Sequence, residues 1–408
     1  MKPTNEGSLA AERGRRELES GAEWQAIRGA FLAGGDARAA QSAITRMTES
    51  VVARACEETL ERSLPGPIAV YAVGGFARAA LLPYAHPEIL VMRETERPAA
   101  GESGAEFAAR LRERGVLPGV RIHTLAECAT LLERNPDLAR KLLDRRLLRG
   151  DAGLAARFER ELADAFAQRG GALAGRLAAE AVARHSRFLD TPSHREPDVK
   201  DGPGGARDLA LLMALKRLVP GGITASAPAG AAEFLARALC YLHYRAGEER
   251  SVLDLEAQQA IAAQFAPGMA AADWLREFFH HARGVYFALR RAIDDRAEEP
   301  PAREALRWAA LQPLLSGAHA GRALRALESS ASLPAAIPEW TRIEGLVDAD
   351  PDRTLTLDEH TLRAVDALCA LDGAEEAAHR RFAELLPDAE ARAVLTFALL
   401  FHHMGEAA

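Results

Sequence analysis

The chain has 408 residues, 48% of them hydrophobic and 27% charged, and a formal net charge of −7. The apolar fraction is large enough to bury cores, which excludes a disordered or collagen-like protein, and the negative charge provides no general basic surface for nucleic acid. The N-terminus is polar, and the apolar run at 393–401 is far shorter than the ~20 residues of a transmembrane helix. We therefore expect a cytoplasmic protein with neither nucleic acid nor membrane as a partner.

In chain order, the spacing of Ala, Leu, Arg and Glu predicts two helices within 9–64, separated at Gly34-Gly35. Three β-type runs at 68–73, 88–92 and 119–123, with a helix at 103–114 before the third, predict a small mixed sheet. The pattern is helical over 125–189 and gives way to an irregular loop at 191–206. Further helices are predicted at 207–218, 229–246, 257–265, 271–296 and 303–314 and, after a connector at 333–352, within 358–408.

This order of elements predicts an α+β fold, in which a small mixed-sheet domain is embedded in a mostly helical chain. We divide the chain into an N-terminal helical segment (1–65), a sheet domain (66–150), a helical domain with a Gly-Pro-Gly-Gly loop (151–332) and a C-terminal helical section (333–408).

The segment VGGFARAALLPYAHPEILVM joins the first two predicted strands. A strand that ends in Gly74-Gly75 before a helix lets the backbone approach a phosphate, and Arg78 offers a charge-assisted contact to the same group. The second strand then presents His86 and Glu88 on one face. This arrangement favours a nucleotide-binding turn beside two candidate catalytic side chains.

The same segment resembles nucleotidyltransferases of the polymerase-β type, and most closely the bacterial PII uridylyltransferase/uridylyl-removing family. That family carries Gly-Gly-Tyr-Gly-Arg-Gly-Glu-Leu and then Pro-Tyr-Ser-Asp-Ile-Asp-Leu-Leu. Here Ala77 and Ala79 replace glycines, and His86 and Glu88 stand where the two metal-binding aspartates belong.

The departure bears on catalysis, because nucleotidyl transfer as implied by the resemblance needs Mg²⁺ to align a triphosphate. Mg²⁺ prefers carboxylate oxygens, so the imidazole of His86 is a poor ligand, and Glu88 is one methylene longer than aspartate. The candidate strand for a third carboxylate, 114–124, contains no Asp or Glu. We expect little turnover, with Mg²⁺ as the cofactor only if the chain is active.

A second stretch, EPDVKDGPGGARDL, matches the family's Glu-Pro-Asn-x-Lys-x-Gly-Pro-Gly-Gly-Leu-Arg-Asp-Leu at ten of fourteen positions. Two interpretations stay open. Lys200 and Arg207 flank Gly204 and Gly205, whose backbone N–H groups would suit an anion such as a nucleotide phosphate. Alternatively, the glycines are needed for a structural loop that starts a helix.

The last section resembles the entry to an HD phosphohydrolase domain. His360 stands in Asp-Glu-His-Thr-Leu, at the family's first metal histidine, and His402-His403 take the place of the signature His-Asp pair. The three histidines form a candidate Zn²⁺ or Ni²⁺ site, with relics of a lost site as the alternative. We expect a partial, degenerate HD-like domain.

Three hypotheses follow. The first is a non-catalytic or weakly active relative, a nucleotide- or protein-binding regulator linked to nitrogen signalling, with an NTP and a PII-type signalling protein as candidate partners. The alternative is an active nucleotidyltransferase that transfers UMP or AMP from an NTP to a PII-type protein, using Glu88 and another carboxylate. The third is a truncated reading frame of a larger enzyme.

Overall fold

A computed structural model provides the fold. The residues that it describes are 5–63, 66–94, 100–294, 308–317, 319–330, 332–347, 353–371, 376–383 and 389–404. The first residues of the helix predicted at 303–314, and parts of the predicted 333–352 connector, lie outside these ranges.

The N-terminal region is helical, as predicted, but more finely divided. Its helices are α1 (Asn5–Ser20), α2 (Ala22–Gly34), α3 (Ala37–Glu58) and α4 (Leu60–Ser63). The predicted break at Gly34-Gly35 is confirmed: Gly35 has φ +69° and ends α2, and Asp36 caps α3 by accepting a hydrogen bond from the Ala39 N–H. The further break at Gly21 was not predicted.

A four-stranded sheet follows, in the order β3-β2-β1-β4. Its strands are β1 (Ile68–Val73), β2 (Glu88–Arg93), β3 (Gly119–Thr124) and β4 (Arg145–Gly150). β1 pairs antiparallel with both β2 and β4, whereas β2 and β3 run parallel. The first three strands are confirmed. The prediction of continuous helix over 125–189 is wrong at β4, whose sequence RRLLRG has no clean alternation and becomes a strand by pairing with β1.

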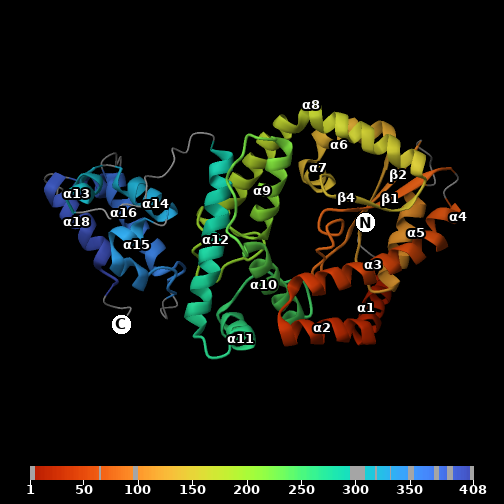
Figure 1. The fold of residues 1–408 in the computed structure, drawn as a ribbon, viewed down its shortest axis with the longest axis horizontal. Helices are drawn as coiled ribbons and strands as arrows, with labels where there is room; N and C mark the ends of the chain where they lie inside the picture. Colours follow the sequence, from red (N-terminus) through yellow and green to blue (C-terminus); the bar gives the residue numbers. More distant parts are fainter. Residues whose placement is uncertain are drawn as a thin grey trace.

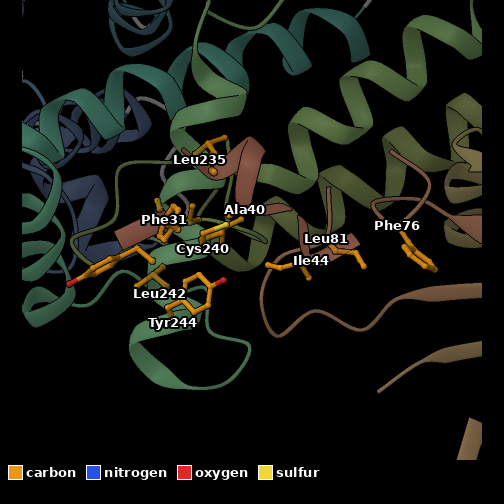
Figure 2. Packing of buried hydrophobic residues seen from close by; sticks show 14 of the residues in the cluster. Phe31, Ala40, Ile44, Phe76, Leu81, Leu235, Cys240, Leu242 and Tyr244 are labelled. Atoms are coloured by element: carbon orange, nitrogen blue, oxygen red, sulfur yellow. The ribbon is translucent and has the colours of Figure 1, made fainter. Parts of the chain in front are cut away.

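Both faces of the sheet are buried, so its central strands divide their residues between two cores. Val70, Ala72, Ile89 and Val91 belong to a cluster with the N-terminal helices and α10 (Ala231–Ala246). Figure 2 shows part of that cluster, with Phe31 of α2 near Leu235 and Cys240 of α10. The alternate residues face a second cluster with α7 (Pro136–Leu142) and α8 (Ala152–His185).

The other helices around these cores are α5 (Ala100–Glu113), α6 (Cys128–Arg134), α9 (Ala206–Leu218), α11 (Leu255–Phe265) and α12 (Ala271–Ile293). In Figure 1, α8 runs over one side of the sheet while α1, α2 and α3 lie on the other, and α12 stands between these layers and the C-terminal helices.

The C-terminal helices have a core of their own around Trp340, whose side chain is fully buried. They are α13 (Trp308–Ser316), α14 (Ala320–Ser329), α15 (Leu333–Ala336), α16 (Leu357–Ala370), α17 (Ala377–Ala383) and α18 (Ala389–Phe401). The protein is therefore α+β and mostly helical, with a single mixed sheet among the described residues. Within those same residues, we find no helix with the length and apolarity required to cross a bilayer.

Candidate functional site

The turn after β1 uses its polar groups internally. The Gly74 N–H donates to the carbonyls of Lys141 (3.2 Å) and Asp144 (2.7 Å), with Gly74 at φ +64°. The N–H groups of Arg78 and Ala80 donate to the carbonyls of Gly74 and Gly75. The helix predicted after Gly74-Gly75 is wrong: the segment is a series of turns. Ala79, where the family has glycine, adopts a left-handed φ of +56°.

Arg78, the candidate phosphate contact, lies in an ion-pair group. Its guanidinium binds the carboxylate of Asp144, which also accepts a hydrogen bond from Arg217 of α9 at 2.6 Å. Two cations therefore share one carboxylate beside the Gly74 turn. The contact fixes Arg78 between the sheet and α9.

Glu88, at one of the two candidate metal positions, is bound to an internal cation. The Lys141 ammonium lies 2.9 Å from Glu88 Oε1 and 2.8 Å from Asp137 Oδ2, so it bridges two carboxylates. Arg121 Nε of β3 lies 3.8 Å from the other Glu88 oxygen. Burial disfavours ionisation of Asp137, but hydrogen bonds from Lys141 and Arg140 outweigh it and lower the pKa of Asp137 to about 2. The Lys141 ammonium thus lies between two carboxylates, one of which, Glu88, stands at a metal-binding position of the family that the sequence resembles.

His86, the other candidate metal position, has a different partner. It precedes β2, its side chain is 54% exposed, and its Nε2 lies 3.8 Å from Glu249 Oε2. Glu249 also binds the ammonium of Lys200, from the Gly-Pro-Gly-Gly loop. Burial opposes ionisation of Glu249, yet the Lys200 contact lowers its pKa. The structure thus brings His86 and Lys200 to one carboxylate, and Glu88 to another group.

The Gly-Pro-Gly-Gly loop is closely packed. Gly204 has φ +77°, and a Cβ on it would lie 2.0 Å from the Ala282 carbonyl oxygen of α12; one on Gly205 would lie 2.7 Å from the Val199 carbonyl oxygen. The Gly204 N–H donates to Asp208 Oδ2 at 2.7 Å, and the Gly205 N–H to the Gly202 carbonyl. These contacts favour the structural interpretation of the two glycines.

The charged residues of the same motif divide into a buried and an exposed pair. Asp208 is fully buried and binds Arg184 Nη2 at 2.5 Å and His185 Nε2 at 2.9 Å, both from α8. Arg207, the candidate anion ligand, is half-exposed and lies 3.1 Å from Asp201 Oδ1. Asp208 therefore joins α8, α9 and the glycine turn.

The three candidate metal histidines lie together at the end of α18 and the start of α16. Ligand atoms of His360, His402 and His403 are within 4.8 Å of one another. His402 Nδ1 faces the Leu399 carbonyl, which only accepts, so in the neutral tautomer that fits this contact Nδ1 is the donor and Nε2 is the nitrogen available to a metal. Three imidazoles at this spacing fit Zn²⁺ or Ni²⁺ with an open coordination position.

We expect Zn²⁺ to bind with a stoichiometry of one at this histidine cluster. His402→Ala should weaken the affinity on the order of 100-fold, because it removes one of three nitrogen ligands. Isothermal titration calorimetry with ZnCl₂ measures both values. His379→Ala, which removes an exposed histidine of α17, is the matched control and should bind as the wild type does. Equal affinity of the His402→Ala protein would contradict the site.

Sequence reasoning did not single out Lys141 or Asp137. They are four residues apart on α7, a spacing that indicates an ion pair on one helix face. That signal alone did not connect them to Glu88, which lies 53 residues before Lys141 in sequence.

Known proteins match this chain in part. A family model described as GlnD PII-uridylyltransferase matches residues 173–291, from α8 to α12. The bifunctional uridylyltransferase/uridylyl-removing enzyme of Burkholderia orbicola (strain AU 1054) is 32% identical over 176 residues, 43% of this chain and 20% of that protein. The enzyme of the same name from Bordetella avium is 34% identical over 155 residues, 38% and 18% of the two chains. The chain spans about a fifth of the length of the curated relatives that it matches.

Proposed function

We propose that this chain, a relative of the bacterial bifunctional PII uridylyltransferase/uridylyl-removing enzymes over part of their length, is a non-catalytic regulator that binds a PII-type signalling protein without modifying it. The link to PII and to nitrogen signalling rests on the relationship. The proposed absence of turnover is supported by one observation in this chain: the Lys141 ammonium lies 2.9 Å from Glu88 Oε1 and so engages the carboxylate that would have to bind a metal.

The donor set near β2 does not fit two Mg²⁺ ions. Glu88 is bound by Lys141, and His86 offers an imidazole nitrogen directed to Glu249, whereas Mg²⁺ requires several oxygen ligands in octahedral geometry. Arg78 and the Gly74 N–H, which would hold a triphosphate, also have internal partners. Each lost contact to a transferring phosphoryl group costs several kcal/mol of transition-state stabilisation, and each ~1.4 kcal/mol is a tenfold loss in rate.

We expect the purified protein to transfer no UMP above background from UTP to a PII protein, with Mg²⁺ or Mn²⁺ present, and to retain PII on an immobilised surface without nucleotide. Radiolabel transfer and surface plasmon resonance measure the two properties. Metal-dependent labelling of PII that Glu88→Ala abolishes, and that Glu94→Ala at the exposed end of β2 leaves intact, would overturn the proposal.

A second candidate, an active nucleotidyltransferase, is favoured by the position of Asp137. This carboxylate shares Lys141 with Glu88, so the pair would become available to a divalent cation if the ammonium moved away. In that case Lys141→Ala should raise UMP transfer above the wild-type rate. If the protein is non-catalytic, Lys141→Ala leaves transfer at background.

A further inference from the structure

We propose that a cavity between α12 and the C-terminal helices binds a small primary amine with an apolar body, and that Glu328 holds its ammonium group. We call this cavity the Glu328 pocket. Its volume is about 350 Å³, and its walls are the 189–193 loop, α12, α14 and α16. It lies where α14 approaches α12 (Figure 1). Neither the Gly74 turn nor the three histidines of the candidate metal site line it.

The carboxylate of Glu328 is enclosed but has no hydrogen-bond partner among the residues that the structure describes. Its side chain is 7% exposed, and its ion contact with Arg283 Nη1 is 3.7 Å long, which is beyond hydrogen-bond distance. Neither of its oxygens is sealed from solvent, so an occupant of the cavity can reach them. A mostly desolvated carboxylate without a donor is costly, and a cationic N–H is the strongest donor available to it.

The other charges around the cavity cancel and leave Glu328 over. Four arginines line the cavity, and each of them has a carboxylate other than Glu328 as a partner. The pairs are Arg283 with Asp358, Arg290 with Asp190, Arg325 with Asp366 and Arg363 with Glu359. Because each pair is neutral, these groups together keep one surplus negative charge when Glu328 is ionised. The surplus favours a cation as the occupant and disfavours a carboxylate or a phosphate.

Without a ligand, a proton on Glu328 reduces the cost of its burial. Burial raises the pKa of Glu328 to about 7; Asp358 and Glu359 of α16 add to the rise, and Arg283 and Arg325 oppose it. A bound ammonium group favours the ionised carboxylate, so binding should displace this proton. The affinity for an amine should therefore increase as the pH rises through about 7.

The remaining walls suit an apolar body. They are formed by Leu189, Pro192, Tyr286 and Phe287. The two aromatic rings, whose centres are 5.2 Å apart, add a surface that attracts cations as well as apolar groups. The Tyr286 hydroxyl donates to the Asp190 carbonyl at 2.9 Å, so the loop is fixed to α12 before a ligand arrives. The volume falls at the lower end of the range of about 300–1,000 Å³ that is usual for small-molecule sites, which favours a ligand with a single ring.

The test uses 2-phenylethylamine and, as its uncharged match, 2-phenylethanol, in which a hydroxyl replaces the ammonium group. Isothermal titration calorimetry at pH 8 should give saturable binding of the amine with a stoichiometry of one. At pH 5 the affinity for the amine should be lower by up to about 100-fold, because only about 1% of Glu328 remains ionised. The affinity for 2-phenylethanol should be the same at both pH values.

Glu328→Gln keeps the shape of the side chain and removes its charge. It should weaken binding of the amine at pH 8 about 10- to 100-fold, the usual range for a lost hydrogen bond between charged groups, and abolish the pH dependence. Glu344→Gln is the matched control, because Glu344 Oε1 also lies 3.7 Å from Arg283 Nη1 but its side chain is 42% exposed and lies outside the lining. This variant should bind the amine as the wild type does.

The proposal is overturned if the amine shows no saturable binding, if its affinity is equal at pH 5 and pH 8, or if both variants lose the same affinity. The pH comparison uses the wild type alone, so it decides even where Glu328→Gln fails to fold. None of these measurements involves PII or a nucleotide, so the pocket can fail while the proposed function stands.

Discussion

Asp208→Asn should lower the free energy of unfolding by about 3–5 kcal/mol, the range measured when one partner of a buried ion pair is removed. Asp208 is fully buried, and the Arg184 side chain that it binds is only 6% exposed. With asparagine, the guanidinium remains buried without its countercharge. Two further hydrogen bonds, from His185 and from the Gly204 N–H, lose their charged acceptor. Urea unfolding followed by circular dichroism measures the difference.

Asp201→Asn is the matched control, because it makes the same chemical change seven residues earlier in the same motif. Asp201 pairs with Arg207, and both side chains are more than one-third exposed. Such a pair contributes about 0–1 kcal/mol. If both variants lose the same stability, Asp208 does not have the anchoring role assigned to it.

Glu328→Gln should stabilise the protein at pH 8 by up to about 3 kcal/mol and change little at pH 5. Burial raises the pKa of Glu328 to about 7. Arg283 of α12 and Arg325 of α14 oppose this rise, and Asp358 and Glu359 of α16 add to it. Arg283 also binds the carboxylate of Asp358, so the positive charge of Arg283 is only partly available to stabilise the ionised form of Glu328.

The direction of the pH effect follows from proton uptake. Between pH 4.5 and about 7 the unfolded chain has released the Glu328 proton while the folded protein keeps it, so stability falls as pH rises through this window. At about 1.4 kcal/mol per pH unit, the fall reaches about 3 kcal/mol near pH 7, and glutamine, which has no proton to lose, avoids it. Urea unfolding at pH 5, 6, 7 and 8 checks the curve. Glu339→Gln, at an exposed glutamate of the 338–342 turn, should follow the wild type, and a Glu328→Gln curve parallel to the wild type would refute the assignment.

Much of the fold could be predicted from local patterns. β1 and β2 are short apolar runs bounded by Gly and Pro, and α12 has an apolar stripe at helical spacing. β4 could not, because its Arg-rich sequence is compatible with a helix and only its pairing with β1 decides its conformation. The helix predicted after Gly74-Gly75 was wrong for a related reason. Whether Gly-Gly leads into a helix depends on tertiary contacts, and here the Gly74 N–H donates to the carbonyls of Lys141 and Asp144, at and after the end of α7.

The sequence could predict which residues belong to the candidate site, but not which side chains those residues contact. The three histidines were singled out by resemblance, and the structure brings them together. For His86 and Glu88, the sequence indicated a weakened metal site and could not show that Lys141 binds the Glu88 carboxylate, since that contact joins distant parts of the chain. The choice between the two interpretations of Gly204 and Gly205 also depended on tertiary contacts, with α12 and with Asp208, which the sequence could not show.

The ammonium that bridges Glu88 and Asp137 is covalently attached to the chain, so it is present beside those carboxylates whatever the ions in solution. It cannot be washed away, chelated or exchanged. The local architecture around β2 is consequently independent of the magnesium supply of the cell, and the protein keeps this part of its shape through ionic fluctuations that would empty an ordinary metal centre.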